Sequence, residues 1–246
     1  MSEQDVYVGR PTGFYQATST YPSVRDEEVE LLLKGLLKKE LKDLCIINSQ
    51  GGFFYDALKS TPLQLNSVVL LESSTELLSH HPYSALRKHI QLDKLSEIED
   101  SYDSVLCLAG LHHCNSYTNV FNGLHSILKK GGLLRIAEVE EGSEVCVWLN
   151  TYVNKWTTSG HRGNFLKLEQ VEQLCKPFSI SSIHRATPTW RFKSADESAD
   201  FFRLFFGLKD VSNFELISTM REVFRTRTTN DGFELEWPLI SIECLK

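Results

Sequence analysis

The chain of 246 residues lacks the features that mark several protein classes. No run approaches the roughly 18 consecutive apolar residues of a membrane helix, and residues 1–7 are polar and acidic without the apolar segment of a signal peptide. No GxSxG or Walker motif is present, and Asn48–Phe53 does not supply GxGxxG. These absences disfavour serine hydrolases of that type, P-loop NTPases and dinucleotide-binding dehydrogenases.

Paired cysteine motifs and an excess of positive charge are also absent. None of the six cysteines forms a CxxC pair, and most lie in apolar runs, which is typical of buried free thiols in a reducing compartment. We therefore expect a cytoplasmic protein without a metal site. With 26 Lys and Arg against 32 Asp and Glu, the net charge is −6, which argues against a general nucleic-acid binder.

Short apolar runs alternate with helical patterns in the first 140 residues. Runs rich in Val, Ile and Leu predict strands buried on both faces at 44–47, 68–71, 104–109 and 133–137. Helical spacing extends from Glu27 to Leu41, with Asp26 placed to cap it, and recurs at 55–59, 75–80 and 119–128. This alternation predicts a doubly wound α/β sheet with right-handed crossovers.

The pattern changes after Glu138. Helices are predicted at 144–156, 168–174, 195–207 and 214–224, a strand at 180–185, and a last strand at 233–244 that is interrupted by Pro238. The two later helices precede the last strand, and we expect them to form a helical lid over the sheet at about 194–228.

Ligands of open α/β sheets bind beyond the carboxyl ends of the strands. The first predicted strand leads into Gly51 and Gly52, where the backbone can approach a ligand closely. The second strand ends at Glu72, whose carboxylate can accept hydrogen bonds from both hydroxyls of a ribose. The fourth strand leads into His112 and His113.

Two motifs at these strands resemble the class I S-adenosylmethionine-dependent methyltransferases. One runs from Tyr102-Asp103-x-Val105 to Leu111-His112-His113, and the other is Leu124-x-x-Ile127-Leu128-Lys129-Lys130-Gly131-Gly132-x-Leu134-x-Ile136-x-Glu138. The resemblance covers about residues 40–140. It implies a Rossmann-like sheet of seven strands with the last antiparallel, S-adenosylmethionine as cofactor and S-adenosylhomocysteine as product.

We expect one domain over 1–246, with an N-terminal flap at 1–25, a cofactor-binding half at 26–140 and a substrate half at 141–246. The flap is expected from the aromatic composition of that segment, in which Tyr15 and Tyr21 would fold over the cofactor. The resemblance also assigns a cofactor site. Asp93 falls where the family has an acid beside the adenine, although an Asp at the start of a loop also caps turns. The implied cofactor-binding residues are Asn48, Ser49, Gln50, Gly51, Gly52, Glu72, Ser73, Asp93 and Leu111.

The cofactor loop departs from the family pattern. Ile46 stands at the position of the family's acid, and Asn48 and Gln50 replace the first two glycines, while Gly52 is retained. The Gln50 side chain either obstructs the methionine part of the cofactor or bonds to it. The departure motivates an alternative function: a methyltransferase-like protein that binds a ligand or partner without methyl transfer, or uses the pocket for other chemistry.

Three histidines are the candidate catalytic residues, because imidazole can take a proton from a hydroxyl or amine as it attacks a methyl carbon. His112 and His113 lie at the end of the fourth strand, and His161 lies in the turn Ser159–Gly163. The alternatives are packing roles for the first two and a surface turn for the third.

The candidate substrate-binding residues are Tyr15, Tyr21, Arg162, Trp190 and Arg191. Our first hypothesis is methyl transfer to an O, N or C nucleophile of a small molecule, by in-line alignment of the reacting atoms. We expect no nucleic-acid partner and no membrane partner, and a homodimer is possible. Methylation of RNA or protein is a lesser hypothesis that requires a basic surface around the pocket.

Overall fold

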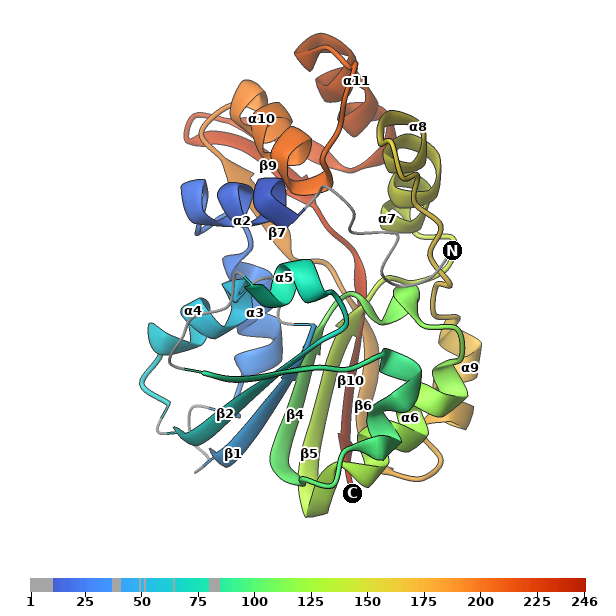
Figure 1. The fold of residues 1–246 in the computed structure, drawn as a ribbon. Coiled ribbons are helices and arrows are strands. Elements are labelled where there is room, and N and C mark those ends of the chain that lie inside the picture. Colours follow the sequence, from blue (N-terminus) through green and yellow to red (C-terminus); the bar gives the residue numbers. More distant parts are fainter. Residues whose placement is uncertain (1–10, 37–40, 49, 51, 64, 80–84) are drawn as a thin grey trace.

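The computed structural model describes residues 11–36, 41–48, 50, 52–63, 65–79 and 85–246. Figure 1 shows a twisted sheet flanked by helices, with a second layer of helices and short strands above one edge of the sheet. We call this second layer the cap; it comprises residues 11–20, 144–156 and 187–238.

The main sheet has seven strands in the order β3-β2-β1-β4-β5-β10-β6. Strands β1 to β5 run parallel, whereas β10 is antiparallel to both β5 and β6. This confirms the predicted fold, including the antiparallel last strand. The strands are β1 Leu41–Ile47, β2 Leu65–Glu72, β3 Leu86–His89, β4 Tyr102–Leu108, β5 Leu128–Glu138, β6 Ser179–Ala186 and β10 Leu239–Leu245.

Both faces of the sheet are covered, because strand residues alternate between two hydrophobic cores. In β1, Leu44 and Ile46 belong to the core that includes side chains of α3 (Asp26–Leu33), α4 (Phe53–Lys59) and α5 (Thr75–Ser79). Cys45 and Ile47 belong to the opposite core. That core includes side chains of η2 (Leu92–Glu97), α6 (Tyr117–Ser126) and α9 (Leu168–Leu174).

The cap contains helices and a small antiparallel sheet in the order β7-β9-β8. Its aromatic interior joins the first of the two cores, so the cap and one face of the main sheet share a continuous apolar cluster. The cap elements are α2 Pro11–Thr20, α7 Glu144–Val147, the π-helical η4 Trp148–Val153, α8 Asn154–Trp156, β7 Thr189–Phe192, α10 Ala195–Phe206, α11 Asn213–Val223, β8 Thr226–Thr229 and β9 Gly232–Glu236.

Two predicted elements were wrong in extent. The helix expected over 27–41 ends at Leu33, because Gly35 has a φ of 78°, and Leu41 begins β1 instead. Asp26 lies inside α3, whose N-cap residue Arg25 makes no side-chain cap.

The strand expected over 233–244 is two strands, β9 and β10, which lie in different sheets. Pro238 separates them, because its nitrogen has no hydrogen to donate to a ladder.

The six cysteines are free and buried, which confirms the prediction from their apolar surroundings. Within the part of the chain that the structure describes, no helix has both the length and the apolar character needed to cross a bilayer.

Candidate active site

A cavity of about 90 Å³ lies between the carboxyl edge of the main sheet and the cap. The sheet contributes Gln50 from the loop after β1, His112 and His113 from the segment after β4, and Val139 from the end of β5. The cap closes the other side with apolar and aromatic side chains. The cap residues are Phe14, Leu149, Trp190, Phe205, Phe206 and Trp237, and His161 comes from the loop that follows α8.

Backbone strain is concentrated at this edge of the sheet. Among the described non-glycine residues, four have a positive φ, and three of them are Asn48 (49°), Gln50 (56°) and Ala109 (53°). The left-handed conformation costs an L-residue roughly 1–2 kcal/mol, and such strain clusters at functional sites. Asn48 and Gln50 thus have the left-handed backbone conformation that glycine adopts most easily, although both carry side chains.

The Asn48 side chain connects three strand ends. Its Nδ2 donates to the carbonyl oxygen of Gly110 at 3.3 Å, and its Oδ1 accepts from the backbone N–H (3.3 Å) and hydroxyl (3.1 Å) of Ser73. Gly110 has a φ of 94°, and a Cβ there would lie 2.9 Å from Asn48 Nδ2. The amide therefore occupies the space between the ends of β1, β2 and β4.

The Gln50 side chain connects the loop to the segment between α2 and α3. Its Nε2 donates to the carbonyl oxygen of Leu108 at 2.7 Å, and its Oε1 accepts from Nη1 of Arg25 at 2.5 Å. Arg25 is buried and pairs with the buried Glu28, which also accepts from Nε1 of Trp190 at 2.8 Å. Burial raises the pKa of Glu28, while the Arg25 charge opposes that rise. Sequence analysis missed this network.

Glu72 lies fully buried at the end of β2, beside Asn48 and Ser73. Its Oε1 accepts from the backbone N–H groups of Ser73 (3.1 Å) and Ser74 (3.4 Å). These bonds fix the carboxylate at the sheet edge, at the position where the sequence predicts a ribose ligand.

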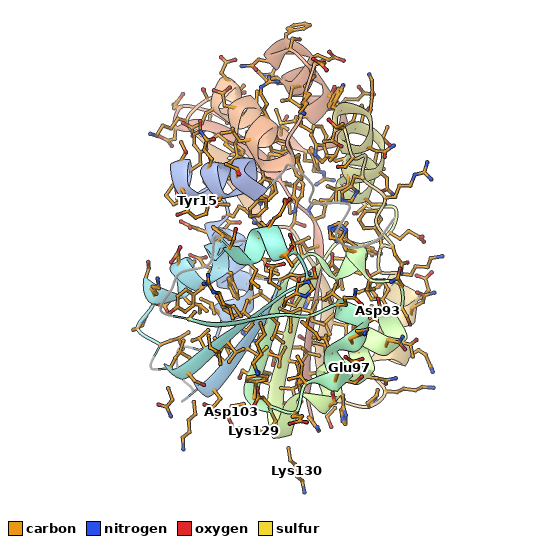
Figure 2. The ribbon with its side chains drawn as sticks, viewed as in Figure 1. Tyr15, Asp93, Glu97, Asp103, Lys129 and Lys130 are labelled. Carbon is orange, nitrogen blue, oxygen red and sulfur yellow. The ribbon has the colours of Figure 1, made fainter. Side chains whose placement is uncertain are left out.

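Asp93 lies in η2 and has structural partners. Its carboxylate accepts from the backbone N–H groups of Asn115 (2.9 Å) and Ser116 (2.8 Å), where it supports the start of α6. Figure 2 places Asp93 on the side of the sheet that carries η2 and α6. This geometry corresponds to the turn-capping alternative, and Asp93 does not line the cavity.

The three candidate catalytic histidines come together at the cavity. His112 and His113 form part of η3 (Leu111–His113), and His161 comes from the loop after α8. The ring centroids lie 4.2 Å apart for His112 and His113, 5.6 Å for His112 and His161, and 5.4 Å for His113 and His161. Residues almost 50 positions apart in the sequence thus share one site.

A buried carboxylate orients the first of these rings. Nδ1 of His112 lies 2.8 Å from Oε1 of Glu138, which is fully buried at the end of β5. The other Glu138 oxygen accepts from the backbone N–H of Leu111 at 2.7 Å. Because Nδ1 bonds with Glu138, Nε2 is the His112 nitrogen that Glu138 leaves available for other partners. Glu138 was not predicted as a site residue, although it ends a strand at the same edge as Glu72.

The remaining predicted site residues lie in different places. Trp190 lines the cavity, whereas Arg191 forms an ion pair with Glu27 at 2.5 Å and Arg162 is exposed. Tyr21 packs on Phe201, with ring centroids 5.9 Å apart. Tyr15 lies on α2 (Figure 2) and lines a separate groove of about 1240 Å³, which none of the cavity histidines lines.

The last five candidate positions belong to the loop after β1 and to the strand ends. Gly52 precedes α4 with a φ of 96°, and Leu111 and Ser73 are buried at the sheet edge. Ser49 and Gly51 lie outside the described residues.

Comparison with known proteins is consistent with this architecture. Residues 51–136 match a family model described as a methyltransferase domain, and the match begins just after the two replaced glycines. No curated protein sequence matches the chain.

Several solved structures share the fold. Haemonchus contortus phosphoethanolamine N-methyltransferase 2, in complex with S-adenosyl-L-methionine, has a TM-score of 0.64 at 15% identity, over 100% of this chain and 60% of that one. The YcgJ protein of Bacillus subtilis has a TM-score of 0.61 at 13% sequence identity, over 90% of this chain and 98% of that one. A third structure is geranyl diphosphate C-methyltransferase from Streptomyces coelicolor, in complex with Mg²⁺, geranyl diphosphate and S-adenosyl-L-homocysteine. Its TM-score is 0.55 at 9% sequence identity, over 94% of this chain and 83% of that one.

The resemblance seen in the two sequence motifs is therefore confirmed. The chain has the class I methyltransferase fold, and its residues 51–136 match the model of a methyltransferase domain.

Proposed function

We propose that the protein is an S-adenosylmethionine-dependent methyltransferase that acts on an O, N or C nucleophile of a small molecule. The observation that carries this proposal is the position of Glu72, a fixed carboxylate at the end of β2 next to a loop that keeps the glycine-type backbone at Asn48 and Gln50. This combination suits a nucleoside whose ribose bonds the carboxylate while the rest of the cofactor crosses the loop.

The positions of the Asn48 and Gln50 side chains leave too little space for the proposed cofactor. A cavity of about 90 Å³ is far below the roughly 300–1,000 Å³ of ordinary ligand pockets. Asn48 and Gln50 fill the space between β1 and β4. Binding therefore requires Gln50 to leave Leu108 and Arg25, which a rotation of its side chain accomplishes without a change in the loop backbone.

The residues of this chain then have distinct tasks. Glu72 and Ser73 would hold the ribose, and the loop 48–52 would hold the methionine part, where the bound cofactor supplies an activated methyl group. His112 is the proposed acceptor of the nucleophile's proton, through Nε2, with Glu138 fixing the ring. His113 and His161 would orient the nucleophile in line with the methyl carbon.

A small substrate fits the enclosed, aromatic setting of the cavity. Trp190, Phe205 and Trp237 form its cap side, and the net charge of −6 does not favour a polynucleotide. Enclosure also keeps water away from the reacting atoms.

Calorimetry with S-adenosylmethionine and S-adenosylhomocysteine tests the proposal. We expect both to bind the wild-type protein, and Glu72→Gln and Glu72→Ala to weaken binding strongly. Glu76→Ala, at an exposed position four residues away, is the matched control and should leave binding unchanged. If neither compound binds the folded protein, the proposal is wrong.

The filled loop also supports a second candidate, a methyltransferase-like protein that binds a ligand or partner without methyl transfer. Its specific observation is the set of hydrogen bonds that hold Asn48 and Gln50 across the cofactor space. Absence of binding by both cofactor forms, with the fold intact, favours this second function.

A further inference from the structure

The three cavity histidines have the arrangement of a metal-binding cluster. One ring nitrogen from each of His112, His113 and His161 lies within 4.8 Å of the others. Ligand nitrogens around a tetrahedral zinc ion, each at about 2.0–2.1 Å from the metal, lie roughly 3.3–3.4 Å apart. Metal binding would therefore require the three ring nitrogens to move closer together by up to about 1.5 Å.

Glu138 adds the outer partner that such sites use. Metal-bound histidines usually donate their second ring N–H to a carboxylate or carbonyl group, which fixes the tautomer and the ring orientation. Nδ1 of His112 lies 2.8 Å from the buried Glu138, so Nε2 remains as the metal ligand. The buried negative charge of Glu138 also favours a cation at the other side of this ring.

The two loops that carry the histidines are fixed to each other. The backbone N–H of Asn164 donates to the carbonyl oxygen of His112 at 2.7 Å, and the N–H of His161 donates to Oδ1 of Asn154 at 2.9 Å. Phe165 stacks on the His112 ring at 5.1 Å. A site held in this way needs little reorganisation to bind an ion.

We propose that His112, His113 and His161 bind a divalent transition-metal ion of the zinc type, with one coordination position open to the cavity. Imidazole ligands suit Zn²⁺, Co²⁺ and Ni²⁺, whereas Mg²⁺ and Ca²⁺ prefer oxygen ligands. Three protein ligands with an open position are typical of catalytic rather than structural zinc sites. This proposal replaces the expectation from sequence that the protein binds no metal.

The role of the ion in catalysis rests on the proposed function. The binding of the ion is independent of that function. At the open position it would hold an oxygen of the small-molecule substrate near the methyl group. Nε2 of His112 is then a metal ligand and not a proton acceptor.

The experiment is a titration of the metal-free protein with Zn²⁺, and with Co²⁺ followed by visible absorption, in the absence of cofactor and substrate. We expect one ion per chain, a tetrahedral Co²⁺ spectrum, and no comparable binding of Mg²⁺. Glu138→Gln should lower the affinity by about 10- to 100-fold. Alanine at His112, His113 or His161 should lower it further.

His184→Ala is the matched control, because this histidine is exposed on β6 and does not belong to the cluster. Circular dichroism of every variant separates loss of a ligand from loss of the fold, and the half-buried His113 gives the variant least sensitive to packing. No binding of Zn²⁺ or Co²⁺, or binding that survives all three cluster substitutions, overturns the proposal. If metal binding fails while S-adenosylhomocysteine binds, only this inference falls and the histidines remain bases. If the metal binds while S-adenosylhomocysteine does not, the metal site stands and the proposed methyltransferase function is wrong.

Discussion

At the scale of single residues, Gln50 is the side chain that we expect to limit the space for a cofactor. Its backbone has the left-handed conformation of a glycine, yet its side chain bonds Leu108 and Arg25 across the cavity. The residue is thus under backbone strain and is stabilised by its own hydrogen bonds. Each such bond contributes about 0.5–1.5 kcal/mol to stability, which is comparable to the strain.

Gln50→Gly should therefore increase cofactor affinity with little change in stability. The variant removes two hydrogen bonds that the ligand would otherwise displace, about 2 kcal/mol together, which corresponds to a gain of more than about tenfold. Relief of backbone strain should keep the free energy of unfolding within about 1 kcal/mol of the wild-type value. Calorimetry with S-adenosylhomocysteine and urea unfolding measure the two effects.

Gln50→Ala is the matched comparison, because it empties the same space but keeps a Cβ at the strained position. It should bind the ligand about as well as Gln50→Gly and be less stable by roughly 1 kcal/mol. Equal affinities in wild-type protein and both variants would show that Gln50 does not limit binding.

The sequence predicts which candidate residues come together where strand ends supply them. Glu72 and the pair His112 and His113 follow buried apolar runs, so their shared edge follows from the topology of a parallel sheet. The link from Arg25 to Gln50 joins residues 25 positions apart. No local pattern specifies that pairing, because it depends on how the segment after α2 packs on the sheet edge.

At the scale of elements, α2 is attached to α10 by close backbone packing. A Cβ at Gly13 would lie 2.7 Å from the carbonyl oxygen of Leu204, and Phe14 packs on Phe205 with ring centroids 4.4 Å apart. Phe14 and Phe205 both line the cavity. The contact between the two helices therefore sets the position of one cavity wall.

Gly13→Ala should destabilise the protein by about 1 kcal/mol or more. Overpacking costs roughly 1–3 kcal/mol, and the better helix propensity of alanine returns at most about 1 kcal/mol. Gln16→Ala, at an exposed position of α2, is the control and should not lower stability. A shift of the urea midpoint is the readout, and equal midpoints for both variants would contradict the packing argument.

Elements with a strong periodic pattern are predictable, and short paired ones are not. The prediction of a helix over 168–174 matches α9 residue for residue. The four-residue strands β7 and β8 were not predicted, because each is defined by its pairing with β9 and not by its own sequence. Of this small sheet only β8 falls within the range of about 194–228 where the helical lid is expected.

At the scale of the whole molecule, the two ends of the strands in the main sheet differ in character. The edge away from the cap is joined by charges: Lys129 lies 2.6 Å from Asp43 and 3.2 Å from Asp103, and the N–H of Asp43 donates to Asp103 at 2.9 Å. Figure 2 shows Asp103 and Lys129 at this lower edge. Hydrogen bonds from Lys129 and Ser67 lower the pKa of Asp43. Backbone strain thus occurs at the strand ends next to the cap, and ion pairs occur at the opposite strand ends.

This edge should make stability depend on pH. The folded-state pKa of Asp43 is below the ordinary value of 3.8. The Asp43 carboxylate therefore stabilises the folded protein at pH values above 3.8, and this stabilisation is lost as the pH falls through the folded-state pKa. Asp43→Asn should therefore be less stable than the wild type at neutral pH, and the difference should vanish in acid. Urea unfolding over a pH series measures it, with the exposed Asp231→Asn as control. A difference that is constant with pH would exclude this account.

The composition of the cap also has a spectroscopic consequence. All four tryptophans, Trp148, Trp156, Trp190 and Trp237, lie in the cap, so intrinsic fluorescence reports on the cap alone, while far-ultraviolet circular dichroism reports on the whole chain. Because one apolar cluster joins the cap to the sheet, the two signals should change together during denaturation. Ligand entry, in contrast, should change the emission of the stacked pair Trp190 and Trp237 without a change in circular dichroism. Emission thus distinguishes local opening of the cavity from loss of the fold.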